Sequence, residues 1–380
     1  MAGYVCAIGS ALNPLDVIKE CAKKGIYSTF INSLASGPFE GTLADYTSMN
    51  PDDNIYFFHQ RKIYGIGKIT NVGIDCKYCN FPESSKLEEY AYTKIKENLL
   101  VDYGENSPKH RWLCTFKADP YFFKDGIDMD EVLKYKPNTF KMLRAFWKLS
   151  FIKIGDEENE SLKELFLLRH QEQPGESNVF QESSETHNAI SNCADLQSHI
   201  INPYDLIKTL NTNGVIEHEK ALEAAVIYDL CHDRIDLLSH WDYVSHQVIA
   251  SPFKPVDYMD KIDVFGIRYL PNTKIPCKFL VAELKKENAD CETIDQVLKY
   301  VDWVCCDYAY GNYNAIEACI IASTYDEVVS DYYNDYVRRF FTVGSHPAKN
   351  MEWNGLKLLR YKYENGRIIY TDCTPLSPSN

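Results

Sequence analysis

The chain has 380 residues, of which 45% are hydrophobic and 25% are charged, and its formal net charge is −14 at pH 7. This length suggests two or three domains, and the composition is ordinary for a soluble globular protein. Such an acidic balance argues against tight non-specific binding of nucleic acid by the monomer, but it does not exclude a local basic cleft or acidic residues that gather a metal.

The sequence also indicates a compartment. It contains no run of 18 or more apolar residues, so it predicts no transmembrane helix. Its first residues, MAGYVCAIGSALNP, lack the basic segment and long apolar core of a signal peptide. The thirteen cysteines follow no regular framework, which fits free thiols in a reducing compartment. We therefore expect a cytoplasmic protein with no membrane partner.

The N-terminal part mixes strands with short helices. The segment PLDVIKECAKKG has helical spacing and ends at Gly25, and DNIYFFHQRKIYGIGKITNVG predicts two strands joined by a tight HQRK turn. Gly65 and Gly67 in the second of these strands indicate a bend or a close backbone approach. HRWLCTFKADPYFF is a further strand, and DEVLKYKPNTFKMLRAFWKLSFIKI predicts a helix, a break at Pro137 and a second helix. Together these elements predict a small mixed barrel or sheet with helices packed outside.

Residues 171–199 differ from the rest of the chain in composition. They contain five acidic residues and no Lys or Arg, and Ser, Gln, Asn and Glu dominate. This composition predicts an acidic polar linker or a long exposed loop. It would separate an N-terminal domain, residues 1–170, from a C-terminal domain, residues 200–380.

The C-terminal part predicts a mixed sheet with flanking helices. GVIEHEKALEAAVIYDLC reads as a helix, KIDVFGIRYL and IPCKFLVAEL as strands joined by a PNTK turn, and AIEACIIAS as a buried strand. Between them, CETIDQVLKYVDWV carries an apolar helical stripe: Ile294, Val297, Leu298 and Val301. This order of helices and strands predicts an α+β or α/β fold.

A pair of charged residues ends the apolar run of FLVAELKK. Glu283 and Lys285 are two residues apart in a predicted strand, so their side chains point to the same face. A hairpin would bring Asp263, in the preceding strand, beside Glu283. Two carboxylates this close repel each other unless a cation lies between them, and hard oxygen ligands suit Mg²⁺ or Mn²⁺. Such a metal could activate water and neutralise phosphate charge, with Lys285 orienting or deprotonating that water.

This pattern of Asp, about twenty residues and Glu-x-Lys resembles the PD-(D/E)xK nuclease superfamily. Members often carry a further glutamate on an upstream helix, and Glu223 in ALEAAV is the best match, with Glu219 second. Gln296 and Tyr300 form a Gln-x-x-x-Tyr pair at positions i and i+4 of a helix, which is the mark of the RecB-like branch. The segment from about 217 to 323 is most similar to NucS-type, RecB-like nuclease domains. A proline that often precedes the family's aspartate is absent from DKIDVF.

The resemblance implies a restriction-endonuclease-like C-terminal domain and a metal-dependent endodeoxyribonuclease of restriction or antiphage defence. It implies a Mg²⁺ or Mn²⁺ site built from three carboxylates: Glu223, Asp263 and Glu283. Lys285 would serve the attacking water, and Gln296 and Tyr300 would position the DNA backbone or the active-site shell. Because two strand cuts need two active sites, the function favours a homodimer. Two alternatives stay open, namely a nucleic-acid-binding protein with an inactive nuclease fold and an RNA-directed nuclease.

The N-terminal part resembles another group of domains. DDNIYFFHQRKIYGIGKI is similar to the strand-turn-strand of PUA-like domains, including the EVE and ASCH groups, over about residues 1–165. The resemblance implies a small β-barrel that recognises RNA or a modified base in DNA. Tyr27, Phe57 and Trp112 are the candidates to sandwich such a base. The alternative is that these aromatic side chains fill the core.

Three further features of the sequence concern metal, phosphate or histidine chemistry. CKYC has zinc-knuckle spacing, and a four-ligand site would need a second pair from HRWLC, giving Cys76, Cys79, His110 and Cys114. The alternative is unpaired thiols. GIGKI lacks the frame of a phosphate-binding loop. No role is assigned to three histidines near Trp241: His232, His240 and His246.

Overall fold

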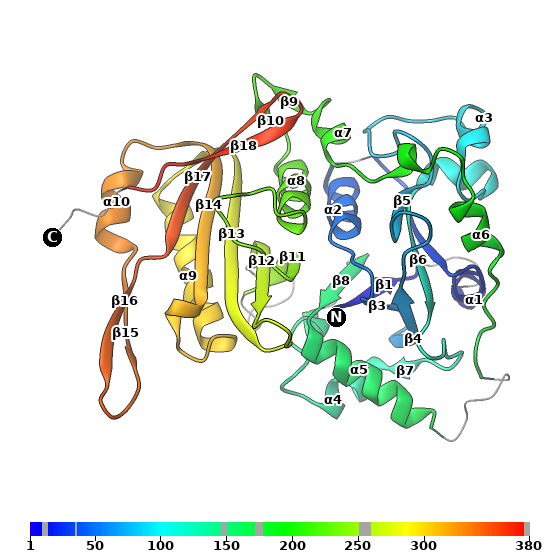
Figure 1. The fold of residues 1–380 in the computed structure, drawn as a ribbon, viewed down its shortest axis with the longest axis horizontal. Helices are drawn as coiled ribbons and strands as arrows, with labels where there is room; N and C mark the ends of the chain where they lie inside the picture. The colour runs from blue at the N-terminus through cyan, green and yellow to red at the C-terminus, as the bar shows by residue number, and fades with distance from the viewer. Residues whose placement is uncertain (10–13, 35, 146–149, 172–177, 251–259, 376–380) are drawn as a thin grey trace. The chain divides into compact units, whose positions relative to one another are not determined.

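The computed structural model describes the chain except for residues 10–13, 35, 146–149, 172–177, 251–259 and 376–380 (Figure 1). The chain divides into two compact units, Met1–Asp205 and Leu206–Asn380. Each unit combines helices with a sheet, as the sequence predicts. None of the helices that the structure describes is both long and apolar enough to cross a membrane.

The N-terminal unit is built on a curved mixed sheet with the strand order β2-β6-β4-β3-β1-β8, to which β5 and β7 are added at β6 and β4. Its strands are β1 (Gly3–Ala7), β2 (Ile26–Phe30), β3 (Asn54–His59), β4 (Lys62–Ile69), β5 (Lys77–Cys79), β6 (His110–Ala118), β7 (Ile127–Asp128) and β8 (Phe151–Ile154). Its helices are α1 (Pro14–Lys24), α2 (Ser36–Thr47), α3 (Tyr92–Ile95), α4 (Met129–Tyr135), α5 (Asp156–Arg169) and α6 (Glu185–Ser191). Over the described residues the strand path is open, so the sheet is a half-barrel, and the expectation of a small mixed barrel or sheet with helices outside is met at this coarse level.

The predicted hairpin of this unit is confirmed. His59 pairs with Lys62, and the two residues between them, Gln60 and Arg61, have φ of 46° and 62°. Positive φ at both positions is the signature of a two-residue type I′ turn, whose twist matches that of the strands. Gly67 allows the predicted close approach, because a Cβ atom there would lie 2.6 Å from Cγ2 of Ile55.

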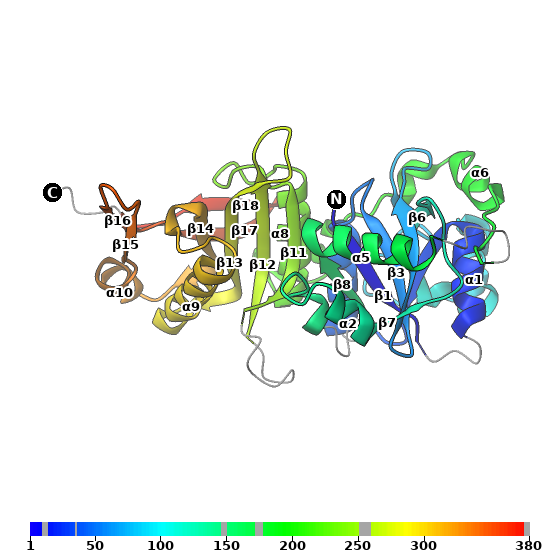
Figure 2. The same ribbon diagram turned by 90° about the horizontal axis from the view of Figure 1, so that it is seen from below.

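The expectation of two helices between residues 130 and 154 is half wrong. The first helix is α4, but Leu143–Ala145 form a single 3-10 turn and residues 146–149 lie outside the described part of the chain. The remaining segment forms strand β8, which pairs antiparallel with β1. Its residues FIKI are all buried, and pairing with β1 satisfies the backbone groups on one side of this edge strand. Helix α5 then crosses β1 and β4 (Figure 2).

Of residues 171–199, expected to form a linker or a long exposed loop, 172–177 lie outside the described part of the chain, and the residues that follow pack on the N-terminal unit. Val179 forms an isolated β-bridge with Phe123, outside the strands of the sheet, and α6 follows within a few residues. Ile190 and Leu196 join a buried cluster with residues of the sheet, and Nε2 of His187 lies 2.9 Å from the carbonyl oxygen of Gly25. The few apolar residues in this polar stretch therefore anchor it, and the unit extends to Asp205.

A buried carboxylate on α5 gives this unit a pH-dependent stability. Glu158 accepts hydrogen bonds from the amides of Lys141, Met142 and Leu143, at 2.7, 2.7 and 3.2 Å. Burial outweighs these bonds and raises the pKa of Glu158 from 4.5 to about 7. The folded chain thus binds a proton that the unfolded chain releases between these values. The contribution of Glu158 to the free energy of unfolding falls as pH rises through this window, by about 3 kcal/mol.

Glu158→Gln mimics the protonated side chain and is expected to remove this part of the pH dependence. Denaturant unfolding at pH 5 and at pH 7.5, together with hydrogen exchange of the three amides, measures the effect. Glu160→Gln, an exposed position on the same helix, is the control. An unchanged pH dependence in Glu158→Gln would show that Glu158 remains ionised when folded.

The C-terminal unit contains a six-stranded mixed sheet with the order β11-β12-β13-β14-β17-β18. Its strands are β9 (Asn211–Thr212), β10 (Val215–Ile216), β11 (Tyr243–Ile249), β12 (Lys261–Tyr269), β13 (Pro276–Ala289), β14 (Ile316–Tyr325), β15 (Arg339–Val343), β16 (Lys349–Trp353), β17 (Leu356–Glu364) and β18 (Arg367–Asp372). Its helices are α8 (Glu219–Cys231), α9 (Cys291–Asp307) and α10 (Val329–Tyr336), while α7 (Tyr204–Ile207) spans the boundary between the units.

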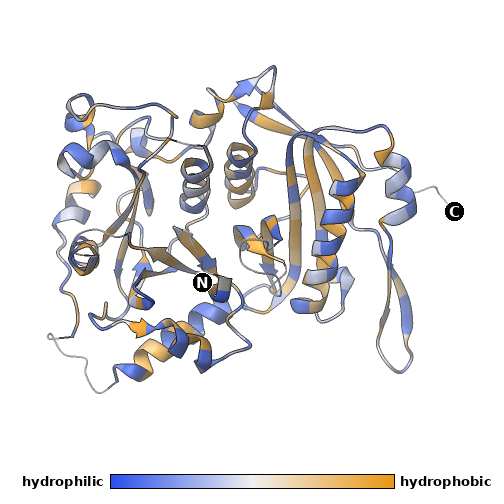
Figure 3. Ribbon diagram, turned by 180° about the vertical axis from the view of Figure 1, so that it is seen from behind, coloured by the Kyte–Doolittle hydropathy of each residue, from blue (hydrophilic) through white to orange (hydrophobic). Residues whose placement is uncertain are grey.

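Helices α8 and α9 hold this sheet between them. Helix α8 packs against β11–β13 and α9 against β13 and β14, on the two sides of the strands in Figure 1. The predicted stripe of α9 is confirmed, since Ile294, Val297, Leu298 and Val301 are all buried. Hydrophobic residues concentrate in the strands of this sheet, whereas α9 shows alternating polar and apolar positions (Figure 3). The predicted mixed sheet with flanking helices is confirmed at this level.

Candidate metal centre

The candidate site lies where strands β12 and β13 separate. Their antiparallel pairing runs from Tyr269 and Pro276 to Val264 and Ala282 and ends there, although β12 remains paired with β11 beyond this point. Asp263 is the next residue of β12. Its Oδ2 accepts a hydrogen bond of 2.9 Å from the amide of Leu284, so a side chain takes the place of the backbone partner. The point where β12 and β13 separate, beyond Val264 and Ala282, is called the fork below.

Glu283 and Lys285 occupy the opposite branch of this fork. Nζ of Lys285 donates a hydrogen bond of 2.9 Å to Oε1 of Glu283. Glu283 is only 2% exposed, and its Oε2 is buried and has no hydrogen-bond partner among the described residues. The expectation that these residues end the strand is wrong, since β13 continues to Ala289. What ends at this point is the pairing of β13 with β12.

Helix α8 brings both upstream glutamates close to the fork. Glu223 is buried, and its Oε1 lies 3.1 Å from Nδ1 of His246 and 3.3 Å from Nε2 of Gln247. The same Gln247 nitrogen lies 3.3 Å from Oδ1 of Asp263. Glu219, which is exposed, accepts a hydrogen bond of 3.4 Å from the amide of Lys286. Glu223 therefore adjoins the β12 branch and Glu219 the β13 branch.

The electrostatics of the fork are those of crowded carboxylates. Burial, together with the charges of Glu283 and Glu223, raises the pKa of Asp263 well above its ordinary value. Burial also raises the pKa of Glu283, against the opposing effect of the Lys285 ammonium. Burial would lower the pKa of Lys285, but the neighbouring carboxylates, Glu283 foremost, raise it overall. The carboxylates of the fork outnumber the ammonium groups of Lys285 and Lys261 that interact with them.

The two helical residues of the predicted site lie near the same carboxylates. Nε2 of Gln296 donates a hydrogen bond of 2.8 Å to the hydroxyl of Tyr300. Burial, with the charges of Glu283 and Asp263, raises the pKa of Tyr300 to about 12, although the Gln296 bond works against this. A capping box of Asp290 and Thr293 fixes the start of the helix that carries the pair.

The donor set of the fork fits a hard divalent cation. The donors of Asp263, Glu283 and Glu223 are carboxylate oxygens, which Mg²⁺ and Mn²⁺ prefer, and Oε2 of Glu283 is buried without a hydrogen-bond donor among the described residues. Among the described residues, however, no three His, Cys, Asp or Glu side chains are already arranged as a metal-binding group. The metal therefore stays a prediction, and binding would require these side chains to close around it.

Two residues of this neighbourhood were missed by sequence reasoning. His246 was given no role and Gln247 was not considered, because β11 was not predicted. The sequence feature that could have indicated these two residues is the polar pair HQ inside the strand sequence YVSHQVI. This strand pairs with β12, which carries Asp263. A polar pair at that place interrupts the alternation expected of a half-buried strand.

The three aromatic candidates of the N-terminal unit are core residues. Tyr27, Phe57 and Trp112 are at most 4% exposed. The rings of Tyr27 and Phe57 have centroids 5.3 Å apart, and Nε1 of Trp112 donates to Oγ of Ser85 at 3.1 Å. These contacts correspond to the core-filling alternative, and none of the three presents an exposed ring for a base to stack on.

The residues proposed for zinc are also engaged in the fold. Cys76, Cys79 and Cys114 are buried, and burial raises the pKa of each thiol. Nδ1 of His110 lies 3.2 Å from Oγ of Ser28, and its ring stacks on Tyr103. Within the described residues these four side chains do not form a metal-binding group, and their arrangement favours unpaired buried thiols.

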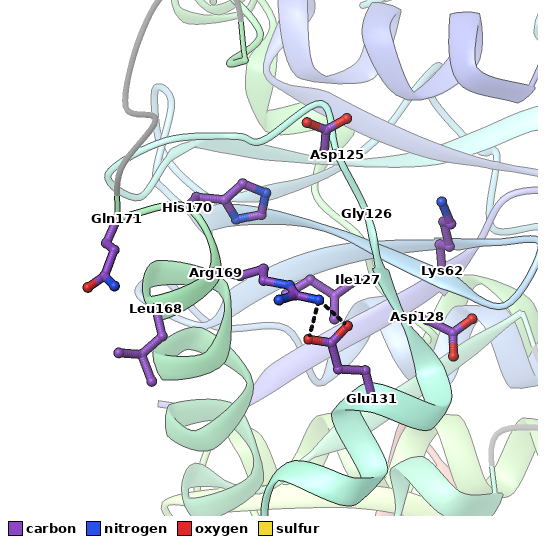
Figure 4. Close-up of a pocket in the computed structure, with 10 residues that line it drawn as sticks. All are labelled: Lys62, Asp125, Gly126, Ile127, Asp128, Glu131, Leu168, Arg169, His170 and Gln171. Carbon is purple, nitrogen blue, oxygen red and sulfur yellow. Dashed lines mark hydrogen bonds and ion pairs between the residues drawn. The ribbon is translucent and has the colours of Figure 1, made fainter.

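A cavity of about 520 Å³ opens in the N-terminal unit beside β7 and the end of α5 (Figure 4). Its charged lining includes Lys62, Asp125 and Asp128, and Nη2 of Arg169 lies 3.0 Å from both carboxylate oxygens of Glu131. None of the three aromatic candidates lines this cavity. No motif in the sequence predicted this cavity.

The sequence matches no model of a known protein family, and it has no significant match among curated proteins. The interpretation of the site therefore depends on its geometry and on the sequence motifs.

Proposed function

We propose that the chain is a metal-dependent endonuclease whose active site is the fork between β12 and β13. One observation carries the proposal. Asp263, Glu283 and Glu223 approach one another at a place where backbone pairing stops, and the buried Oε2 of Glu283 has no partner there. Burying several carboxylates side by side destabilises a fold, so such a cluster is favoured at functional sites.

The proposed reaction is hydrolysis of a phosphodiester bond. A divalent cation held by Asp263 and Glu283 would lower the pKa of a bound water and neutralise charge on the phosphate. Glu223 would complete the ligands of the cation, with His246 and Gln247 next to its Oε1. Lys285, whose ammonium form is favoured by Glu283, would donate a hydrogen bond to the attacked phosphate or to the water, rather than act as a base. Gln296 and Tyr300 would form the wall on the α9 side.

We propose DNA as the substrate and the N-terminal unit as its recognition domain, in a restriction or antiphage role. Pairing of a nuclease with a mixed-sheet recognition unit supports this assignment by analogy. The buried aromatic trio means that recognition would use other surfaces of that unit.

The function is tested by incubating the protein with plasmid DNA and with modified phage DNA, in Mg²⁺ or Mn²⁺ and in EDTA. We expect cleavage of at least one DNA that requires the metal. Parallel RNA substrates identify an RNA-directed nuclease, and metal-independent binding without cleavage of any nucleic acid would contradict the proposal in favour of an inactive, binding fold.

A further inference from the structure

Gln247 has an unusual backbone for its place in a strand. Its φ is 53°, in the left-handed region that residues other than glycine rarely adopt. The pairs on either side, His246 with Val264 and Val248 with Ile262, place Gln247 opposite Asp263 in the register of β11 and β12. An outlier of this kind within a strand is a reason to examine what its side chain does.

The positive φ directs the side chain into the fork. In a regular strand the side chains of His246 and Gln247 would point to opposite faces. Here Nδ1 of His246 and Nε2 of Gln247 both lie within 3.3 Å of Oε1 of Glu223. The Gln247 nitrogen also reaches Oδ1 of Asp263 at 3.3 Å, so one amide group spans two carboxylates from different elements.

We propose that Gln247 is a positioning residue that holds Glu223 and Asp263 at the spacing a divalent cation needs. This inference depends on the proposed metal site and adds to it a residue that is neither a ligand nor part of the sequence motif. The amide of Gln247 carries no charge, so it can bridge the two carboxylates without neutralising the negative charge that attracts the cation. Groups that orient metal ligands in this way typically change metal affinity by about 10- to 100-fold when removed.

The test is Gln247→Gly, because glycine adopts positive φ freely. This variant removes the amide and relieves the backbone, so it should fold at least as stably as the original chain. Asn272→Gly is the matched control, since Asn272 has φ of 60° in the turn between β12 and β13. Calorimetric titration with Mn²⁺ in the absence of nucleic acid measures affinity, and thermal unfolding in EDTA measures stability.

We expect Gln247→Gly to weaken Mn²⁺ binding by about 10-fold or more with an unchanged or higher unfolding temperature. Asn272→Gly should bind Mn²⁺ like the original chain. Unchanged affinity in Gln247→Gly would overturn the inference, and so would a lower unfolding temperature, because it would indicate a purely structural role. If the original chain binds no Mn²⁺, the proposed metal site itself is wrong, which is a distinct result.

Discussion

Lys285→Ala is expected to reduce metal-dependent DNA cleavage by about 10²- to 10⁴-fold while leaving divalent metal binding in place. The ammonium group would act on the phosphate or the water, so its removal affects the reaction. Its loss also frees Oε1 of Glu283, which now accepts the Lys285 hydrogen bond, so the carboxylate stays available to the cation. Cleavage at saturating metal and calorimetric titration separate the two effects.

Lys286→Ala is the matched control for this prediction. Lys286 is the next residue of β13, and its Nζ contacts the carbonyl oxygen of Glu217 rather than the fork. We expect it to retain cleavage close to that of the original chain. Equal rates of cleavage by Lys285→Ala and the original chain would show that Lys285 takes no part in the reaction.

Glu283→Gln is expected to abolish cleavage and, in metal-free buffer, to stabilise the chain by about 1–3 kcal/mol. The carboxylate is 2% exposed with one oxygen unpartnered, and burial raises its pKa, so ionised Glu283 opposes folding. Glutamine keeps an oxygen for Lys285 and gains an amide that can face Asp263. A substitution that stabilises the fold and removes activity is typical of functional sites.

The sign of the pH dependence provides a second check on Glu283. A raised pKa in the folded state means that stability is greatest at low pH and falls as pH rises through the raised value. The gain in free energy of unfolding of Glu283→Gln over the original chain should therefore be largest at neutral pH. It should shrink toward about pH 4, where the Glu283 carboxyl is largely protonated in both the folded and the unfolded state. Denaturant unfolding in EDTA measures it, with the exposed Glu287→Gln of the same strand as control.

The spatial arrangement of the candidate site was largely predictable from the sequence. Asp263, Glu283 and Lys285 meet as expected because a short turn sets the register between two long, strongly apolar strands. Gln296 and Tyr300 share a face of α9 as expected, because the apolar stripe of this segment predicts the helix that spaces them one turn apart. Local patterns of this kind determine their own geometry to a large extent.

Other features depended on tertiary contacts and could not be read in the same way. Residues 171–199 have the composition of a linker, yet Ile190 and Leu196 join a buried cluster of the N-terminal unit. The sequence of strand β8 predicts a helix, because its apolar run has no clear period, whereas pairing with β1 decides its conformation. The bend at Gln247 has no signature in sequence, because glutamine does not favour positive φ.

Exposure of the aromatic residues was the least predictable feature. Tyr27, Phe57 and Trp112 lie in strands whose faces are buried on both sides, a property that depends on how the sheet curves and on the helices above it. Aromatic residues in strands are equally suited to a core and to a binding platform.

The most direct test of the central claim is a crystal structure of the chain grown with Mn²⁺, with the anomalous signal of the metal recorded. We predict a peak at the fork, within about 2.0–2.3 Å of carboxylate oxygens of both Asp263 and Glu283. The account would be contradicted if crystals grown at a saturating Mn²⁺ concentration showed no peak, or only peaks away from these two carboxylates.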